Sequence, residues 1–228
     1  MAAPLSGVRA VVFDAYGTLL DVASAAERTR DLLGDRAGPL AELWRQKQLQ
    51  YTWLRSLMGR HADFWQVTGD ALDYALEALR IDTPDLRRRL MEAYERIGPC
   101  ADAHAALSRL RLAGLKVAIL SNGAPRMLAL AVRSAGLDDL IDETLSVESV
   151  GTYKPHPSVY KLAVDRLGVW PAELGFVSAN GFDAWGAKAA GLRVAWCNRS
   201  GLPRERLGEP PEVELSTLAA LPAALGLP

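Results

Sequence analysis

The 228-residue sequence is short of cysteine, of net charge and of long hydrophobic runs, and each shortage excludes a class of protein. Its two cysteines, Cys100 and Cys197, lie far apart and form no CxxC or Cys/His pattern. This favours buried free thiols in a reducing compartment over a disulfide or a zinc site. The net charge of -1 gives no reason to expect nucleic acid or an anionic membrane as a partner.

Further absences narrow the cellular setting and the cofactors. No apolar stretch approaches the ~20 residues that a membrane span requires. The first residues lack the basic segment and apolar run of a secretion signal, so we expect a cytoplasmic protein. No glycine-rich phosphate-binding motif is present, and His61, His104 and His156 share no metal-ligand spacing. We therefore expect neither a nucleotide cofactor nor a metal.

What the sequence does contain is an alternation of short apolar segments and helical segments. The first apolar run ends at Phe13 and places Asp14 at the end of a strand. Further strands are expected at 116–120, 143–147, 175–178, 193–196 and 213–215, and helices at 127–134, 156–167 and 184–190. Strands separated by helices are typical of a doubly wound parallel sheet. We predict an α/β protein whose Rossmann-like core is made of residues 1–20 and 97–228.

Residues 21–96 interrupt this alternation and are predicted to form an all-helical cap inserted into the core. Apolar and long side chains recur there at helical spacings of three and four, at Leu43, Trp44, Lys47, Tyr51, Leu54 and Met58. A second amphipathic helix is expected at 71–79, and a third with Thr83 as N-cap and Pro84 as first residue. An apolar helix face left exposed on the cap favours a homodimer.

Polar side chains gather at the ends of the predicted strands. Asp14 and Thr18 follow the first strand, and Ser121 and Asn122 follow the second. Ser178, Asn180 and Asp183 follow the fourth strand, and Lys154 precedes the helix at 156–167. Each alone has an ordinary alternative as a turn residue, a helix cap or an exposed lysine. Together they favour a site, because ligands of open α/β sheets bind at the carboxyl ends of the strands.

Four motifs here resemble those of the haloacid dehalogenase superfamily, and within it the L-2-haloacid dehalogenases. They are 14–19 (Asp-Ala-Tyr-Gly-Thr-Leu), 121–123 (Ser-Asn-Gly), Lys154-Pro155 with Tyr160, and 178–183 (Ser-Ala-Asn-Gly-Phe-Asp). The insertion matches through 44–49 and 55–64, so the resemblance covers essentially the whole chain. Where some members of the family carry Trp, this chain has Phe182, which leaves the substrate range open.

The resemblance implies a two-step displacement on a short L-2-haloalkanoate. Asp14 would attack C2 from the side opposite the halogen, which gives an ester and inverts the centre. Water activated by Asp183 would hydrolyse that ester and release a D-2-hydroxy acid. Lys154 would keep Asp14 ionised, because an adjacent cation lowers the pKa of a carboxylate. The residues implied to orient Asp14 and Lys154 are Thr18, Tyr160, Ser178 and Asn180.

The resemblance also assigns contacts to the halide and to the rest of the substrate. Arg45 would hold the halide together with Asn122 and Phe182, since a guanidinium solvates an anion well. From position alone an exposed helix arginine is the favoured interpretation of Arg45, and the motif around it reverses that preference. The substrate carboxylate would lie against Ser121 and Asn122. The implied apolar pocket consists of Tyr16, Gln46, Leu49, Phe64 and Phe182; plain core packing is an equal alternative for Leu49 and Phe64.

Tyr16 separates this chemistry from phosphoryl transfer. A superfamily phosphatase carries Asp at that position as a general acid, and further acidic residues in its last motif, where this chain has Ser178 and Asn180. Halide is the base of a strong acid and leaves without a proton, so the missing acid does not hinder dehalogenation. The sequence therefore favours a dehalogenase with no cofactor. A Mg²⁺-dependent phosphatase and a catalytically silent ligand-binding member remain the alternatives.

Overall fold

The core of the protein is a six-stranded parallel sheet with the strand order β3-β2-β1-β4-β5-β6. The computed structural model describes residues 3–22 and 33–227. The strands are β1 (Ala10–Phe13), β2 (Lys116–Ser121), β3 (Glu143–Ser146), β4 (Leu174–Ser178), β5 (Arg193–Cys197) and β6 (Val213–Leu215). Strand β1 is Ala-Val-Val-Phe and entirely buried, as expected for a central parallel strand that is covered on both faces.

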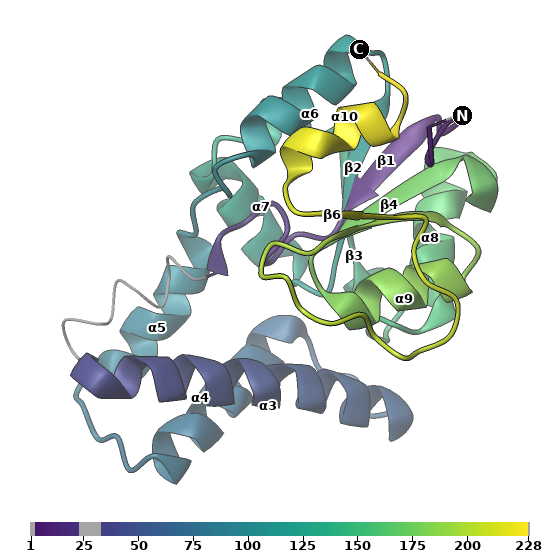
Figure 1. Cartoon of the computed structure of the whole chain (residues 1–228). Helices are drawn as coiled ribbons and strands as arrows, with labels where there is room; N and C mark the ends of the chain where they lie inside the picture. Colours follow the sequence, from purple (N-terminus) through teal and green to yellow (C-terminus); the bar gives the residue numbers. More distant parts are fainter. Residues whose placement is uncertain (1–2, 23–32, 228) are drawn as a thin grey trace.

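Helices cover both faces of this sheet (Figure 1). The helices α6 (Ala103–Leu112), α7 (Pro125–Ser134) and α10 (Leu221–Ala224) lie on one face, and α8 (Pro157–Leu167) and α9 (Gly181–Ala189) on the other. The chain adds β2 and β3 on one side of β1 and then β4, β5 and β6 on the other. Because crossovers between parallel strands are right-handed, this change of side places the connecting helices on opposite faces of the sheet. Short 3-10 helices occupy Gly34–Arg36, Asp138–Leu140, Val147–Ser149, Pro171–Glu173 and Leu218–Ala220.

The helices between β1 and α6 lie apart from the sheet. Helices α3 (Ala37–Leu57) and α4 (Phe64–Ala78) pack against each other, and α5 (Leu86–Glu95) leads back to the core beside α7 (Figure 1). The chain leaves and re-enters the core through one short backbone pairing, in which Asp21 N donates to Gly98 O and Cys100 N to Leu19 O, both at 2.8 Å. This pairing lies beside the predicted boundaries of the insertion, of which residues 23–32 fall outside the described residues.

The third helix of the insertion begins later than the sequence predicts. Thr83 is not its N-cap and Pro84 is not its first residue, because Pro84 lies in a turn and α5 begins at Leu86. Asp85 adopts a left-handed backbone conformation with φ of 59°. A left-handed residue cannot continue a right-handed helix, so the turn and the helix remain separate. The second helix, by contrast, begins seven residues before the predicted 71–79 segment, at Phe64, where Asp63 caps it by accepting from Gln66 N at 2.8 Å.

The predicted α/β fold is confirmed, with every expected strand present in a single parallel sheet. Cys100 and Cys197 are free thiols, as predicted, although Cys100 is only half-buried. Among the described residues, none of the helices combines the length and apolar character needed to cross a membrane.

Candidate active site

Asp14 lies directly after the central strand, where its backbone is fixed by the neighbouring strand. Its N–H donates to Val177 O of β4 at 2.9 Å. Its carboxylate is 6% exposed and accepts three side-chain hydrogen bonds. The donors are Lys154 Nζ at 3.0 Å, Asn180 Nδ2 at 2.9 Å and Thr18 Oγ1 at 3.1 Å. A carboxylate held by this many donors is fixed in one orientation before any substrate arrives.

Lys154 lies between two carboxylates. Its ammonium donates to Asp14 Oδ1 at 3.0 Å and to Asp183 Oδ2 at 2.9 Å, and its side chain is 2% exposed. Burial opposes the charge on this group, but Asp14 and Asp183 outweigh that effect and raise the pKa of Lys154 above its usual value. The group is therefore a permanent cation at neutral pH.

Asp183 is the most enclosed acid of the site. Tyr160 Oη donates to its Oδ1 at 2.8 Å, and its side chain is 1% exposed. Burial raises the pKa of Asp183, Lys154 lowers it, and the negative charge of Asp14 raises it further, for a net upward shift. The Ser178 hydroxyl is a further hydrogen-bond partner. When ionised, a carboxylate with a raised pKa is a stronger base than an ordinary Asp.

Ser121 and Asn122 line the neighbouring strand end. The Asn122 side-chain oxygen accepts from Lys154 N at 3.1 Å, and the Ser121 hydroxyl accepts from Gly123 N at 3.1 Å. Both side chains are almost fully buried. A Cβ on Gly123 would come within 2.9 Å of the Tyr16 ring, so glycine is required for the ring to pack over this turn.

Arg45 reaches the core from helix α3. Its Nη2 donates to Asn180 Oδ1 at 3.2 Å, and the same Asn180 donates through Nδ2 to Asp14. The guanidinium is half-buried rather than exposed. The alternative of an exposed surface arginine therefore does not describe this residue, and its positive charge lies one side chain away from the Asp14 carboxylate.

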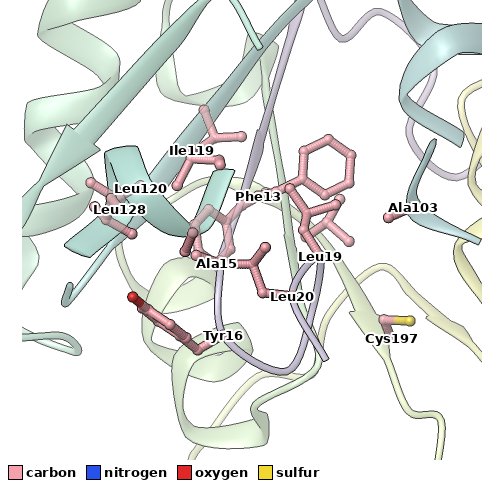
Figure 2. Close-up of a cluster of buried hydrophobic side chains, with 14 of the residues drawn as sticks. Phe13, Ala15, Tyr16, Leu19, Leu20, Ala103, Ile119, Leu120, Leu128 and Cys197 are labelled. Carbon is pink, nitrogen blue, oxygen red and sulfur yellow. The ribbon is translucent and has the colours of Figure 1, made fainter. Parts of the chain in front are cut away.

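Aromatic rings enclose the space between the sheet edge and the inserted helices. Tyr16 and Phe64 are both buried, with ring centroids 6.2 Å apart, and Tyr94 packs 5.8 Å from Tyr16. Figure 2 shows Tyr16 at the edge of the core cluster that contains Phe13, past the end of β1. Among the described residues, the Tyr16 hydroxyl has no hydrogen-bond partner. Burial raises the pKa of this phenol, which stays neutral.

The other predicted pocket residues lie at the margin of this space. Leu49 is half-buried on α3, one turn after Arg45, whereas Gln46 is exposed. Phe182 is half-buried at the start of α9 and meets Trp53 edge to face at 5.1 Å. Gln46 is therefore more exposed than a residue that encloses the alkyl part of a substrate would be, unlike the buried Tyr16 and Phe64.

The structure thus brings together most of the residues that the sequence singled out. Hydrogen bonds link Asp14, Thr18, Arg45, Asn122, Lys154, Tyr160, Asn180 and Asp183 into one network. Sequence reasoning missed Gln48, Trp53, Thr68 and Tyr94, which support Arg45 or the aromatic wall. The available signal for Trp53 was its spacing of four and eight residues from Leu49 and Arg45, which places the three on one helix face.

The donor set does not fit a divalent cation of the kind that phosphatases of this fold use. Mg²⁺ requires several oxygen ligands around it, but the Lys154 ammonium lies within 3.0 Å of both acids that could serve. Within residues 3–22 and 33–227, no cluster of three or more His, Cys, Asp or Glu side chains could hold a metal.

Chemically, the arrangement offers a nucleophile and the groups needed to support it. Asp14 is a fixed carboxylate, Asp183 is a base of raised pKa, and the Lys154 ammonium contacts both and offsets part of their negative charge. Arg45 adds a second positive charge from helix α3, where it contacts Asn180. Such a set can attack an electrophilic carbon, stabilise a departing anion and then activate water.

Comparison with known proteins agrees with this chemistry. A family profile described as haloacid dehalogenase-like hydrolase matches residues 8–191. The chain is 46% identical over 219 residues to (S)-2-haloacid dehalogenase 1 of Pseudomonas sp. (strain CBS-3), covering 96% of each protein. It is 49% identical over 202 residues to the (S)-2-haloacid dehalogenase of Xanthobacter autotrophicus, covering 87% of this chain and 79% of that one.

A solved structure is similar over nearly the same length. It is the L-2-haloacid dehalogenase from Xanthobacter autotrophicus with chloropropionic acid covalently bound, which matches with a TM-score of 0.87 and 43% sequence identity. The match covers 95% of this chain and 97% of that chain.

Proposed function

Because the chain belongs to the haloacid dehalogenase-like hydrolase family, we propose that it hydrolyses short L-2-haloalkanoic acids to D-2-hydroxy acids and halide, without a metal. The observation that carries the proposal is that Asp14 contacts one cation, Lys154 of the core, and is linked through Asn180 to a second, Arg45 of the insertion. A nucleophile that attacks carbon needs the first cation to position it, and a departing halide needs the second.

In the first step, an Asp14 oxygen attacks C2 and the carbon–halogen bond breaks as the new C–O bond forms. Attack from the face opposite the halogen inverts C2, and the halide leaves with the bonding electron pair. Arg45 stabilises that developing negative charge, because its guanidinium approaches from the inserted helices rather than from the strand end that carries Asp14. Asn122 and Phe182 complete the halide site in this proposal.

The substrate carboxylate is proposed to bind at the second strand end. Ser121 and Asn122 are buried there beside Gly123, whose N–H is directed at the Ser121 hydroxyl. These groups lie at the turn between β2 and α7, which offers backbone N–H donors to an anion. Tyr16, Leu49 and Phe64 would enclose the alkyl part of the substrate, with Gln46 near the entrance.

In the second step, water hydrolyses the ester at the Asp14 carboxyl carbon. Asp183 accepts the proton of that water, helped by its raised pKa and fixed by Tyr160 and Ser178. The C–O bond that breaks lies between the Asp14 carboxyl carbon and its bridging oxygen, so the hydroxyl oxygen of the product comes from Asp14. Lys154, Thr18 and Asn180 hold the Asp14 carboxyl in place throughout.

Two assembly features are proposed with this function. The chain is divided into a core of residues 1–20 and 97–228 and a cap of residues 21–96, which closes the site through Arg45. The cap also exposes large apolar side chains at Leu54, Leu57, Met58 and Tyr74, which is consistent with a homodimer formed through the inserted helices.

The experiment that tests the function is halide release from racemic 2-chloropropionate, with and without EDTA. Chloride release that resists EDTA and stops at half conversion is the expected result, since one enantiomer is attacked and no metal takes part. A parallel assay with p-nitrophenyl phosphate and Mg²⁺ tests the phosphatase alternative. Phosphate release without halide release would overturn the proposal, and silence in both assays would favour a catalytically silent binding protein.

A further inference from the structure

Gln48 is a fully buried amide on helix α3, in contact with Arg45. Its Oε1 accepts from Arg45 Nη1 at 2.8 Å, and its Nε2 donates to Thr68 Oγ1 of α4 at 2.8 Å. Arg45 and Gln48 are three residues apart, which places them on the same helix face. A buried amide needs partners for both ends, so its presence in the interior of the insertion calls for a reason.

The direction of each hydrogen bond in this chain of groups is fixed. The Thr68 hydroxyl has one proton, which it donates to Phe64 O at 2.6 Å. Its oxygen is therefore left to accept from the Gln48 NH₂ group, and the Gln48 carbonyl must face Arg45. Because Thr68 and Phe64 share one helix, α4 determines the orientation of a side chain on α3.

The hydrogen-bond partners of Arg45 are neutral, and this affects the charge that its guanidinium presents. Arg45 contacts two neutral amide oxygens, those of Gln48 and Asn180, and forms no ion pair with any described residue. Arg55, ten residues further along the same helix, instead pairs with Asp70 at 2.7 Å. An amide fixes a guanidinium as a carboxylate does, but leaves its positive charge uncompensated.

We propose that Gln48 is a positioning residue that aims Arg45 at the departing halide while leaving its positive charge available. This inference rests on the proposed function and deepens it, because it assigns control of the leaving-group step to a residue that does not touch substrate. The neutral hydrogen bond matters most for the poorer leaving group, since chloride needs more stabilisation in the transition state than bromide does.

The test compares Gln48→Glu with Gln50→Glu, the same chemical change on the exposed face of α3. Gln50 is exposed and its Oε1 accepts only from Lys47 Nζ, at 2.9 Å. A nearly isosteric carboxylate at position 48 would pair with Arg45 and compensate its charge. Thr68→Val is the second variant, because it removes the oxygen that orients Gln48 and adds no charge.

The readout is single-turnover halide release from (S)-2-chloropropionate and (S)-2-bromopropionate, together with inhibition by added bromide and the thermal midpoint. For Gln48→Glu we expect chloride release to slow about ten- to a hundredfold, with a smaller loss for bromide, so that the bromide-to-chloride rate ratio rises. Bromide inhibition should weaken in parallel. Thr68→Val should change the same ratio in the same direction by a smaller factor, and Gln50→Glu should match the unmodified protein.

Four outcomes are distinguished. A raised ratio and weakened bromide inhibition, in variants that keep the thermal midpoint, support it. Equal losses for both substrates with a lowered midpoint would reduce Gln48 to a packing role and overturn it, as would unchanged rates in a folded Gln48→Glu protein. If the unmodified protein releases no halide from either substrate, the proposed function itself is overturned, which is a different result from an active protein whose variants behave alike.

Discussion

Asp14, directly after β1, and Asp183, in the first turn of the helix that follows the adjacent strand β4, accept hydrogen bonds from the same ammonium group. Lys154 thus holds two buried carboxylates in one small space. Without it, each carboxylate would raise the pKa of the other, and neither role proposed for them at neutral pH could be filled.

Replacing Lys154 should therefore reduce the activity sharply. Lys154→Met keeps the length and apolar stem of the side chain but removes the cation, so the pKa of Asp183 should rise further. We expect the rate of halide release at pH 7 to fall at least about a hundredfold and the acid limb of the pH profile to move to higher pH. Lys161→Met is the matched control, because Lys161 is exposed and pairs only with Asp165. Equal effects of the two substitutions would refute the role of Lys154.

The nucleophile is tested most directly by isotope transfer. In H₂¹⁸O, a single turnover should place ¹⁸O in the Asp14 carboxyl group and leave the first product molecule unlabelled, because water attacks the ester at the Asp14 carbon. Mass spectrometry of the peptide that contains Asp14 makes the measurement. Asp14→Asn should reduce turnover to background while keeping the fold, since the amide is isosteric. Label found only in the first product would indicate direct attack by water on C2.

The pH profile follows from the two shifted groups. The base role proposed for Asp183 requires the ionised form, and its pKa is raised, so the acid limb of the activity profile should lie above the usual aspartate value of about 3.9. Lys154 supports Asp14 only when protonated, and its raised pKa should preserve activity up to about pH 10. The measurement is kcat/KM against pH. An alkaline limb near pH 8 would contradict the charge state assigned to Lys154.

Arg45 should affect catalysis more than stability. Arg45→Lys retains a positive charge but cannot contact Gln48 and Asn180 at the same time, because lysine lacks the fork of the guanidinium. We expect a loss of about tenfold or more in kcat for 2-chloropropionate, with a change in thermal midpoint no larger than that of Arg55→Lys on the same helix. A large drop in midpoint with little change in kcat would assign Arg45 a structural role instead.

The junction between the insertion and the core supplies a stability prediction. The Tyr153 hydroxyl donates to Ala62 O, and the Tyr153 backbone N–H donates to Ser56 Oγ at 3.2 Å. Tyr153→Phe leaves the half-buried Ala62 carbonyl without its donor, and should lower the free energy of unfolding by about 1 kcal/mol. Chemical denaturation measures the change. An unchanged unfolding free energy would mean that water replaces the lost hydroxyl.

The sequence predicted which residues lie together in the candidate site where polar side chains are concentrated in short motifs after strands. Asp14, Lys154 and Asp183 could be assigned to one edge because parallel strands present their carboxyl ends together. That reasoning needs only the order of strands and helices, which the hydrophobic pattern indicates directly.

Prediction from the sequence failed where a residue's environment depends on a packing partner that is distant in the chain. Gln48 is one polar residue among several on α3, and only the approach of Thr68 from α4 makes it a buried hydrogen-bonding group. The start of α5 was misjudged for a different reason. Thr83 and Pro84 form a good helix start locally, but the left-handed conformation of Asp85 delays the helix to Leu86.

The central position of β1 has a consequence for how the protein is made. Ala10 pairs with Lys116 on one side and with Leu174 on the other. During translation β1 is therefore synthesised well before either of the strands with which it pairs. Pairings between such distant segments form slowly, because a long loop must close first. Three of the contacts to Asp14 come from Lys154, Val177 and Asn180. The reactive carboxylate is therefore not set in place until most of the polypeptide has been translated, and a truncated nascent chain carries no assembled nucleophile.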